Sequence, residues 1–320
     1  MSALFTRRAA LAALSAMATT PVLAQGGRPI AMMHGFTPGA NVDIVARLVA
    51  ESLGKRLGQT IVVEPRPGAG GTIAAAMVAR SAPDGTTIAI LPGGHAVAAA
   101  IYNKLPYDPV RDFTFIGQLT DFPFILATYP DHPIRSIADI IKGAQADDNK
   151  LTCATAGNGT GMHLAFELFV AMAKAKIQHV PYRGSPQAIT DLLAKRVDFQ
   201  MDTPAALMPL IKDGRVRAIA ITGSNRFFML PDTPSIGDTV KDYAVTSWLG
   251  LAGPAGLPEP FVSKVSAELS SILAEPGVVD RLRAIGSEVR PSTPDGFRAL
   301  VAGDVAKWTR VVADAKIPKV

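Results

Sequence analysis

The sequence predicts an α/β fold with two domains, built from mostly parallel sheets that are flanked by helices. Short apolar, β-branched segments alternate with amphipathic segments along most of the chain, which is the pattern of parallel α/β sheets. The 320 residues suffice for two hydrophobic cores. The 28 glycines and 25 prolines are spread along the chain and indicate many short turns.

The first third of the chain repeats strand, loop and helix. Apolar or β-branched runs predict strands, and apolar residues at helical spacing, such as Val42, Val45 and Leu48, predict helices. Asn41 is a suitable N-cap for the first helix. Strands are expected at residues 29–36, 60–65 and 83–91, and helices at residues 42–58 and 73–80.

The same alternation continues through the middle of the chain. Strands are expected at residues 150–156, 177–182, 197–202 and 216–222, and helices at residues 136–145, 162–175, 188–196 and 204–214. After Trp248 the pattern changes to a Gly/Pro-rich connector, helices, one short strand and a long final helix. These last helices have little strand of their own to cover, so we expect them to pack on the first sheet.

This order predicts a domain made from both ends of the chain, with a second domain inserted into it. Domain 1 is expected to comprise residues 25–122 and 248–320, and domain 2 residues 123–247. The chain then crosses between the domains twice, near residues 121–129 and 245–250. Two neighbouring crossings predict a hinge.

Composition and charge narrow the class of function. Hydrophobic residues make up 48% and charged residues 18%, which excludes a disordered or coiled-coil chain. The formal charge is +5, and the first 24 residues hold two arginines and no acid, so the remainder carries +3. That charge is weak, and no basic stripe is interleaved with aromatic residues. The sequence therefore predicts no nucleic-acid partner.

The N-terminus resembles an export signal over residues 1–24. A basic start at Arg7 and Arg8 precedes an apolar run of small residues and a small-residue cleavage site ending at Ala24. The paired arginines fit a twin-arginine signal loosely, and they also fit the basic start of an ordinary secretory signal. The apolar run is shorter than the ~20 residues of a membrane span. We expect a cleavable signal and a periplasmic protein.

No catalytic or metal-binding set is evident. The five histidines have no metal-type spacing, and the sequence lacks a GxSxG nucleophile elbow. The single cysteine, Cys153, lies in an expected strand and is interpreted as a buried thiol. A catalytic set assembled from distant residues stays an alternative. The sequence favours a protein that is not an enzyme and uses no cofactor or metal.

The stretch "PRPGAGGTIAAA" at residues 65–76 suggests a phosphate-binding loop. A P-loop requires Lys where Thr72 stands, and a dinucleotide fingerprint requires Gly or Ala where Ile73 stands. Two interpretations remain: a tight structural turn, which we favour, and a backbone contact to an anion.

Loops at the carboxyl ends of parallel strands are expected to surround one ligand site. These are residues 36–41, 67–71, 92–95 (with His95), 156–161, 183–186 and 202–204. Several are rich in amides and hydroxyls, which suit a small carboxylate at helix N-termini. The candidates are Thr37, Gly39, Ala40, Asn41, Thr155, Asn158 and Thr160. For Asn41 and Thr160 helix capping is expected as well, and Asp202 either caps the next helix or faces the cleft.

Several segments, in this order, resemble the Bug family, whose members are similar to the receptors of tripartite tricarboxylate transporters. They include "FTPGANVDIVARLVAESLGKRLGQTIVVEPRPGAGGTIAA", "TAGNGTGMHLAFELF" and "HVPYRGSPQAITDLLAKRVDFQMD". The resemblance implies a periplasmic binding protein of the type II-like fold with an interdomain cleft. It implies a di- or tricarboxylate, acidic amino acid or aromatic acid as ligand, delivered to membrane transporter subunits. A monomer is expected, and a sensor or adaptor in signalling is the alternative.

The resemblance also implies which residues hold the ligand. They are, in the first loop, Phe36, Thr37, Pro38, Gly39, Ala40 and Asn41 with Asp43, and in the second Thr155, Gly157, Asn158, Thr160 and Gly161 with His163, joined by Arg183 and Asp202. Ala40 stands where the family usually has glycine, and Thr155 and Thr160 where it usually has serine. The added methyl groups narrow the site, so the identity of the ligand does not carry over.

Overall fold

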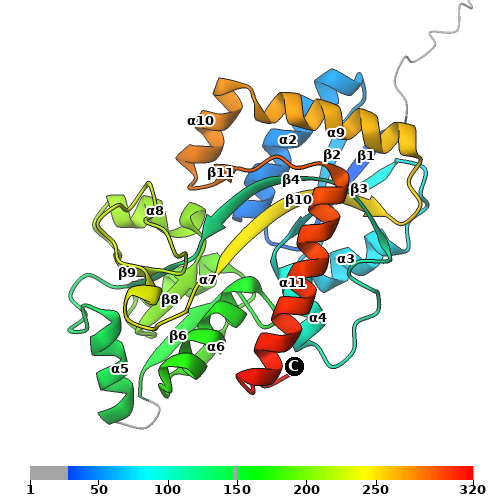
Figure 1. Ribbon diagram of the computed structural model, residues 1–320. Coiled ribbons are helices and arrows are strands. Elements are labelled where there is room, and N and C mark those ends of the chain that lie inside the picture. The colour runs from blue at the N-terminus through cyan, green and yellow to red at the C-terminus, as the bar shows by residue number, and fades with distance from the viewer. Residues whose placement is uncertain (1–27, 147–149, 320) are drawn as a thin grey trace, which may run out of the picture.

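The computed structural model describes residues 28–146 and 150–319. The predicted export signal, residues 1–24, lies outside the described residues. The described chain forms two sheets, each covered by helices (Figure 1). We call the first sheet with its helices lobe 1, and the second sheet with its helices lobe 2.

Lobe 1 contains a six-stranded sheet of order β11-β4-β10-β3-β1-β2. Its strands are β1 (Ile30–His34), β2 (Ile61–Pro65), β3 (Thr87–Pro92), β4 (Phe113–Pro123), β10 (Thr246–Pro254) and β11 (Glu288–Val289). Its helices are α2 (Asn41–Leu57), α3 (Thr72–Ala79), α4 (Gly94–Ile101), α9 (Glu259–Leu273), α10 (Pro276–Ala284) and α11 (Pro294–Asp314), with a 3-10 turn η2 (Ala69–Gly71) before α3.

Lobe 2 contains a five-stranded sheet of order β7-β6-β8-β5-β9. Its strands are β5 (Ile125–Thr128), β6 (Thr152–Thr155), β7 (Gln178–Pro181), β8 (Phe199–Asp202) and β9 (Arg217–Ile221). Its helices are α5 (Ile137–Ala146), α6 (Gly161–Ala173), α7 (Ser185–Leu193) and α8 (Pro204–Lys212), followed by the 3-10 turn η3 (Ile236–Asp238). The four strands and four helices expected between residues 136 and 222 are all found, whereas β5, which follows the first crossing, was not predicted.

The α/β fold class is confirmed, and both sheets are mixed rather than mostly parallel. β1 pairs in parallel with β2 and β3, and β6 with β7 and β8. The strands that carry the chain between the lobes, β4, β5 and β10, pair antiparallel with their neighbours. Parallel neighbours in one sheet are joined by a right-handed helical crossover, and strands that connect two different sheets lack one. The hydrophobic periodicity of the sequence does not show which strands connect the sheets, so the antiparallel pairs were not predicted.

The two crossings lie side by side and are tied together by Thr222. The first crossing joins β4 to β5 at Pro123 and Phe124, and the second leads from η3 into β10. The Thr222 hydroxyl accepts the N–H of Phe124 at 2.8 Å and donates to the carbonyl of Val245 at 2.7 Å, while its carbonyl accepts the N–H of Val245. The predicted domain boundaries fall within a few residues of these crossings and stay a prediction.

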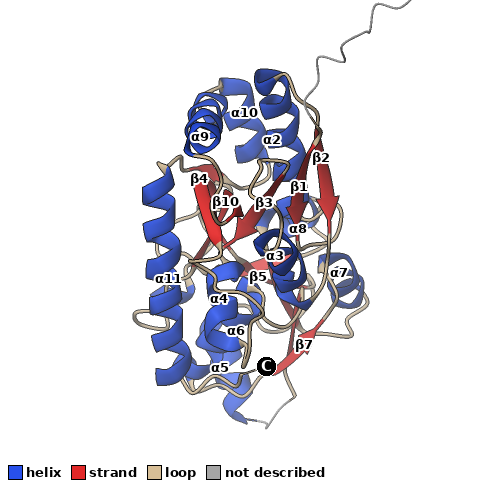
Figure 2. Ribbon diagram, turned by 90° about the vertical axis from the view of Figure 1, so that its right-hand side faces the viewer, coloured by secondary structure: helices blue, strands red, loops and turns tan. Residues whose placement is uncertain are grey.

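The C-terminal helices pack on the first sheet, as expected from the sequence. Helix α11 lies along β4 and α4, and α9 lies against α2 (Figure 2). The Trp248 Nε1–H donates to Asp304 Oδ2 at 2.7 Å, and the Phe297 ring packs edge-on against Trp248. These contacts join β10 to α11, so the end of the chain closes lobe 1.

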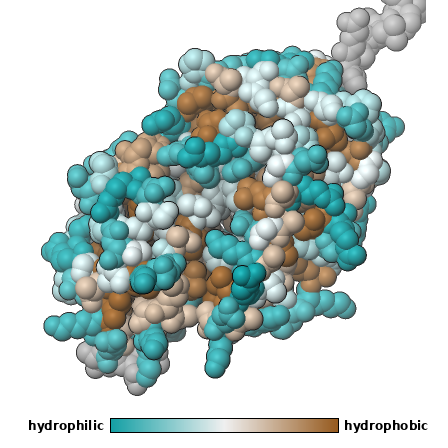
Figure 3. All heavy atoms as spheres, viewed as in Figure 1, coloured by the Kyte–Doolittle hydropathy of each residue, from teal (hydrophilic) through white to brown (hydrophobic). Residues whose placement is uncertain are grey.

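In the described residues no helix is both long enough and apolar enough to cross a membrane. On the face shown in Figure 3, hydrophobic residues form separate patches between hydrophilic ones.

We expect Gly250→Ala to weaken the joint between β10 and α11. A Cβ at Gly250 would overlap the ring of Phe297, which is fully buried. Overpacking of this kind costs about 1–3 kcal/mol, so the free energy of unfolding in urea should fall by that amount. Gly303→Ala, in α11 with nothing within 4 Å of the added Cβ, is the control and should not destabilise. Equal effects of the two variants would contradict this packing argument.

Candidate functional site

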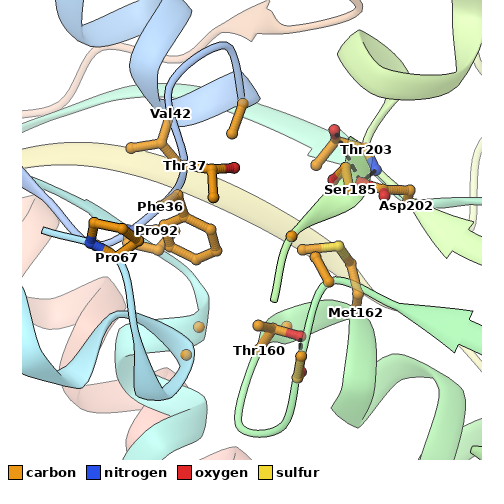
Figure 4. A pocket seen from close by; sticks show the side chains of 18 of the residues that line it. Phe36, Thr37, Val42, Pro67, Pro92, Thr160, Met162, Ser185, Asp202 and Thr203 are labelled. Carbon is orange, nitrogen blue, oxygen red and sulfur yellow. Dashed lines mark hydrogen bonds between the residues drawn. The ribbon is translucent and has the colours of Figure 1, made fainter. Parts of the chain in front are cut away.

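A cavity of about 770 Å³ lies between the two lobes, where the carboxyl ends of their parallel strands face each other. Its size falls within the roughly 300–1,000 Å³ of small-molecule sites. Figure 4 shows Phe36, Thr37 and Val42 on one side, and Thr160, Met162 and Asp202 on the other. The predicted arrangement of strand–helix loops around one cleft is therefore found.

The first of these loops, between β1 and α2, is held by a buried carboxylate. Asp43 Oδ2 accepts the Gly39 N–H at 2.9 Å and the Arg47 Nε–H at 2.9 Å. His34 Nε2 lies 3.0 Å from Asp43 Oδ1, and His34 Nδ1 accepts the N–H of Phe36. Because Nδ1 is an acceptor, the Nε2–H of a neutral ring donates to Asp43.

Ionisation in this network is set by burial and by hydrogen bonds. Burial lowers the pKa of His34, against the opposing effect of its bond to Asp43. Burial alone would raise the pKa of Asp43, but the bonds from Arg47, Gly39 and His34 lower it overall. A neutral histidine thus supports an ionised carboxylate, and that carboxylate fixes the turn at Gly39. Asp43 acts on the loop from behind it and does not line the cavity.

Asn41 lies in the cavity wall with no partner for its side chain. It is 3% exposed, and neither its Oδ1 nor its Nδ2 has a hydrogen bond within the described chain. The predicted capping role is wrong: Ala40 is the N-cap of α2, and Asn41 is the first helical residue. A residue one position inside the helix cannot fold its side chain back over the first-turn N–H groups, so this amide remains available.

Several helices begin at the cavity. Residues at or next to the N-termini of α2, α4, α6 and α7 line it: Asn41, Gly94, Gly161 and Ser185. Neither Ala40 nor Gly184 supplies a side-chain cap to its helix. Unpaired N–H groups and the positive ends of the helix dipoles therefore face the cavity, and they favour an anion.

The second loop, between β6 and α6, is held by two histidines. Thr160 caps α6 by accepting the N–H of His163 at 3.2 Å, which confirms the capping expected there. His163 Nδ1 accepts the N–H of Gly159, and Thr155 Oγ1 accepts that of Gly157. His179 Nε2 lies 2.7 Å from Thr155 Oγ1.

Among the residues that the structure describes, His163, Glu167 and His179 form the group whose side chains could hold a metal ion. Their donor atoms all lie within 4.8 Å of one another. The two imidazole rings, however, are stacked with centroids 4.3 Å apart and an angle of 21°, so their lone pairs run side by side and do not converge. One nitrogen of each ring is already bonded to the loop. The geometry fits a support for the second loop better than a metal centre.

Asp202 is a fully buried acid at the edge of the cavity. Its Oδ2 accepts from Gln200 Nε2 at 2.7 Å, and its Oδ1 accepts the N–H of Thr203. Burial raises the pKa of Asp202, and the bonds from Ser185, Thr203 and Gln200 oppose this effect. Thr203, not Asp202, is the N-cap of α8. An acceptor group therefore stands beside the ligand space.

Ten of the predicted residues line the cavity: Phe36, Thr37, Ala40, Asn41, Gly157, Asn158, Thr160, Gly161, Arg183 and Asp202. Six others do not reach it. Pro38 and Gly39 face solvent, while Asp43, Thr155 and His163 support the loops from behind. His95 is also corrected: α4 begins at Gly94, so its ring turns into the core, where Nε2–H donates to the Pro109 carbonyl.

Apart from Phe36, the aromatic residues of the wall were not predicted from the sequence. Phe122 and Phe124 come from the first crossing, and Tyr102 and Tyr182 from the ends of α4 and β7. Their positions follow the strand registers of two separate sheets, which no local pattern encodes. Residues 183–186 were expected at the ligand site, and Ser185 lines the cavity there although it was not itself named. Cys153, in contrast, is buried in β6 as expected, and burial raises the pKa of its thiol.

We expect acid to destabilise the fold through its buried histidines. Burial lowers the pKa of His95 and His163 to about 4, from 6.5. Such groups stay neutral when folded but take up protons when unfolded, so stability is present above pH 6.5 and is lost as the pH falls toward 4. Each contributes a slope of about 1.4 kcal/mol per pH unit in that window.

Urea unfolding between about pH 7 and about pH 5 measures this slope. In His95→Gln one of these titrating groups is removed, while a side-chain N–H remains to donate to the Pro109 carbonyl. The free energy of unfolding of this variant should therefore change less steeply with pH, by the amount that corresponds to about one proton. A slope unchanged in this variant would contradict the assignment.

The comparisons with known proteins agree with this geometry. The model of the tripartite tricarboxylate transporter family receptor matches residues 45–317. The structure of the periplasmic binding protein BugD is 33% identical, with a TM-score of 0.86, and the match covers 92% of this chain and 99% of that chain.

Two proteins of Rhodopseudomonas palustris, solved with small acids, are similarly close. Rpa4515, solved with adipate, is 31% identical with a TM-score of 0.87, over 93% of this chain and 100% of that chain. MatC, solved with bound malate, is 33% identical with a TM-score of 0.84, over 89% and 99%. The matching family model describes a receptor, and the BugD structure is that of a periplasmic binding protein. The chain therefore belongs to the receptor family of tripartite tricarboxylate transporters, as a periplasmic binding protein of the Bug type.

Proposed function

We propose that this protein captures a small carboxylate between its lobes in the periplasm and delivers it to a tripartite tricarboxylate-type membrane transporter. The observation that carries the proposal is the buried, unpartnered amide of Asn41 at the N-terminus of α2, in the cavity wall. A buried amide without a partner is costly, so this group is matched by the ligand. Its Nδ2–H₂ donates to a carboxylate oxygen beside the first-turn N–H groups.

The electrostatics of the cavity favour one carboxylate near α2 and α6. Helix N-termini supply partial positive charge, and Arg183 is the one cationic side chain among the lining residues of the described chain. Dipoles bind an anion without a buried cation, so the unliganded site does not need a counter-ion. Binding by dipoles also lets the ligand leave again, as delivery requires.

The other residues of the cavity wall indicate the chemical character of the ligand beyond its first carboxylate. Phe36, Tyr102, Phe122, Phe124 and Met162 present rings and a thioether to the cavity. Asp202 adds an acceptor at the lobe 2 side, where a second ionised carboxylate would be repelled. We infer an apolar or aromatic acid, with a hydroxyl, amine or protonated group at its far end. The adipate and malate of the solved relatives fall within the wider class of small acids.

Delivery requires that the cavity opens and closes. The lobes move as two domains about the paired crossings at Phe124 and Val245, which are joined through Thr222. Hinge closure of this kind traps the ligand between the lobes. The transporter then distinguishes the closed, loaded form from the open one.

The test is a thermal-shift screen with benzoate, adipate, malate and citrate. A binding acid present at 100 times its Kd stabilises the folded protein by about 2.7 kcal/mol, which raises Tm. Asn41→Asp should abolish the shift, because a second carboxylate would then face the ligand. Asn225→Asp, the same change at an exposed position of lobe 2, is the control and should keep it. Stabilisation by amines or sugars, with none by acids, would overturn the proposal.

A further inference from the structure

The glycine loop before α3 reaches across the cleft and touches lobe 2. A Cβ added at Gly70 would lie 2.9 Å from the carbonyl oxygen of Asn158 and 2.9 Å from the carbonyl carbon and oxygen of Gly159. These are backbone atoms, which cannot swing aside as the end of a side chain can. The α-carbon of Gly70 is therefore in direct contact with the second loop.

The conformation of the loop explains how Gly70 comes to project. Ala69, Gly70 and Gly71 all have positive φ values, of 46°, 63° and 98°. Three successive left-handed residues are rare, and for Ala69 the conformation is strained. On its inner side, the loop is packed so closely that a Cβ at Gly35 would overlap the backbone of Gly71. The turn is thus packed tightly between Gly35 of lobe 1 and the second loop of lobe 2.

Two other contacts continue the same seam around the cavity. A Cβ at Gly94 would lie 3.2 Å from the N atom of Gly161, so the N-termini of α4 and α6 nearly touch. On the opposite rim, a Cβ at Gly184 would lie 3.0 Å from Thr37 Oγ1. At each of these places a glycine allows the two lobes to approach. The spacing of the cavity walls is thus limited at the rim by contacts of glycine α-carbons, with backbone at Gly70 and Gly94 and with the Thr37 side chain at Gly184.

We propose that Gly70 is a positioning residue at which the lobes close over the ligand, and that its missing side chain sets how far they close. The proposal rests on the proposed function, since closure matters only if a ligand is trapped. It explains the glycine loop without phosphate chemistry: the second glycine of "GAGG" is required by the opposite lobe. A side chain at this position would keep the two lobes apart, while the two loops that line the cavity would keep their structure.

The variant that tests this is Gly70→Asn. Asparagine tolerates the left-handed region, so the loop keeps its conformation and gains a Cβ. Gly58→Asn and Gly214→Asn are matched controls, one in each lobe. Their φ values are 64° and 68°, against 63° for Gly70, and a Cβ at either meets nothing within 4 Å. The three unliganded variants should therefore have similar stability in urea.

The readouts are small-angle X-ray scattering and affinity, each with and without benzoate, adipate, malate and citrate. Wild type and both controls should contract with the acid that binds. Gly70→Asn should stay expanded, and its Kd should rise about tenfold, which is about 1.4 kcal/mol. Because an open receptor binds with reduced apparent affinity, the two effects should appear together.

Two results would overturn the inference. One is identical scattering of Gly70→Asn and Gly58→Asn under every condition. The other is a Kd that rises while the protein still contracts, because the asparagine then obstructs the ligand itself. Failure of the proposed function looks different: wild type then shows no thermal shift with any of the four acids.

Discussion

The double crossing between the lobes is the constraint on which the site depends. The chain leaves the first sheet through β4 and returns through β10, and Thr222 bonds both passages at one place. Because both connections lie together, the two sheets are joined along one side and face each other across a cleft. The carboxyl ends of β1, β3, β6 and β8 are thereby turned toward the same space, and the loops that follow them become its walls.

Each lobe supports its binding loop from behind with groups that would be unsuitable in front of an anion. Asp43 is ionised, yet it points away from the cavity and fixes Gly39 with the help of His34 and Arg47. In lobe 2 the neutral rings of His163 and His179 play the same part for Gly159 and Thr155. The charged and titratable groups thus order the backbone, and the side-chain amide of Asn41 in the cavity wall is left without a partner in the described chain.

The two lobes come into contact at positions where glycines leave room for it. Side chains fill the cavity wall with rings, whereas at Gly70, Gly94 and Gly184 the absence of a side chain lets the lobes come into contact. Glycine has no side chain to order, so the close approach at these three positions costs no side-chain conformational entropy of the glycines. Asp202, fully buried at the lobe 2 side, places acceptor oxygens at the cavity, and we propose that they disfavour a second negative charge on the ligand.

The sequence by itself determined most of the elements and the nature of the loops, because helical spacing, β-branched runs and glycine turns are local properties. The elements that it missed include α4 and β5, and it read the second half of β10 as a connector, because glycines and prolines interrupt that strand. The positions of Thr37, Asn158 and Thr160 at strand ends could be read in the same way. Tertiary structure alone decided what faces the cavity. Asn41 was expected to cap a helix, but the turn held by Asp43 makes Ala40 the cap and frees the amide. His95 was expected in a loop, but the early start of α4 buries it. Gly70 was expected to be part of a turn. Only the tertiary structure shows why a side chain does not fit there: the loop at Gly159, nearly 90 residues away in the sequence, lies against it.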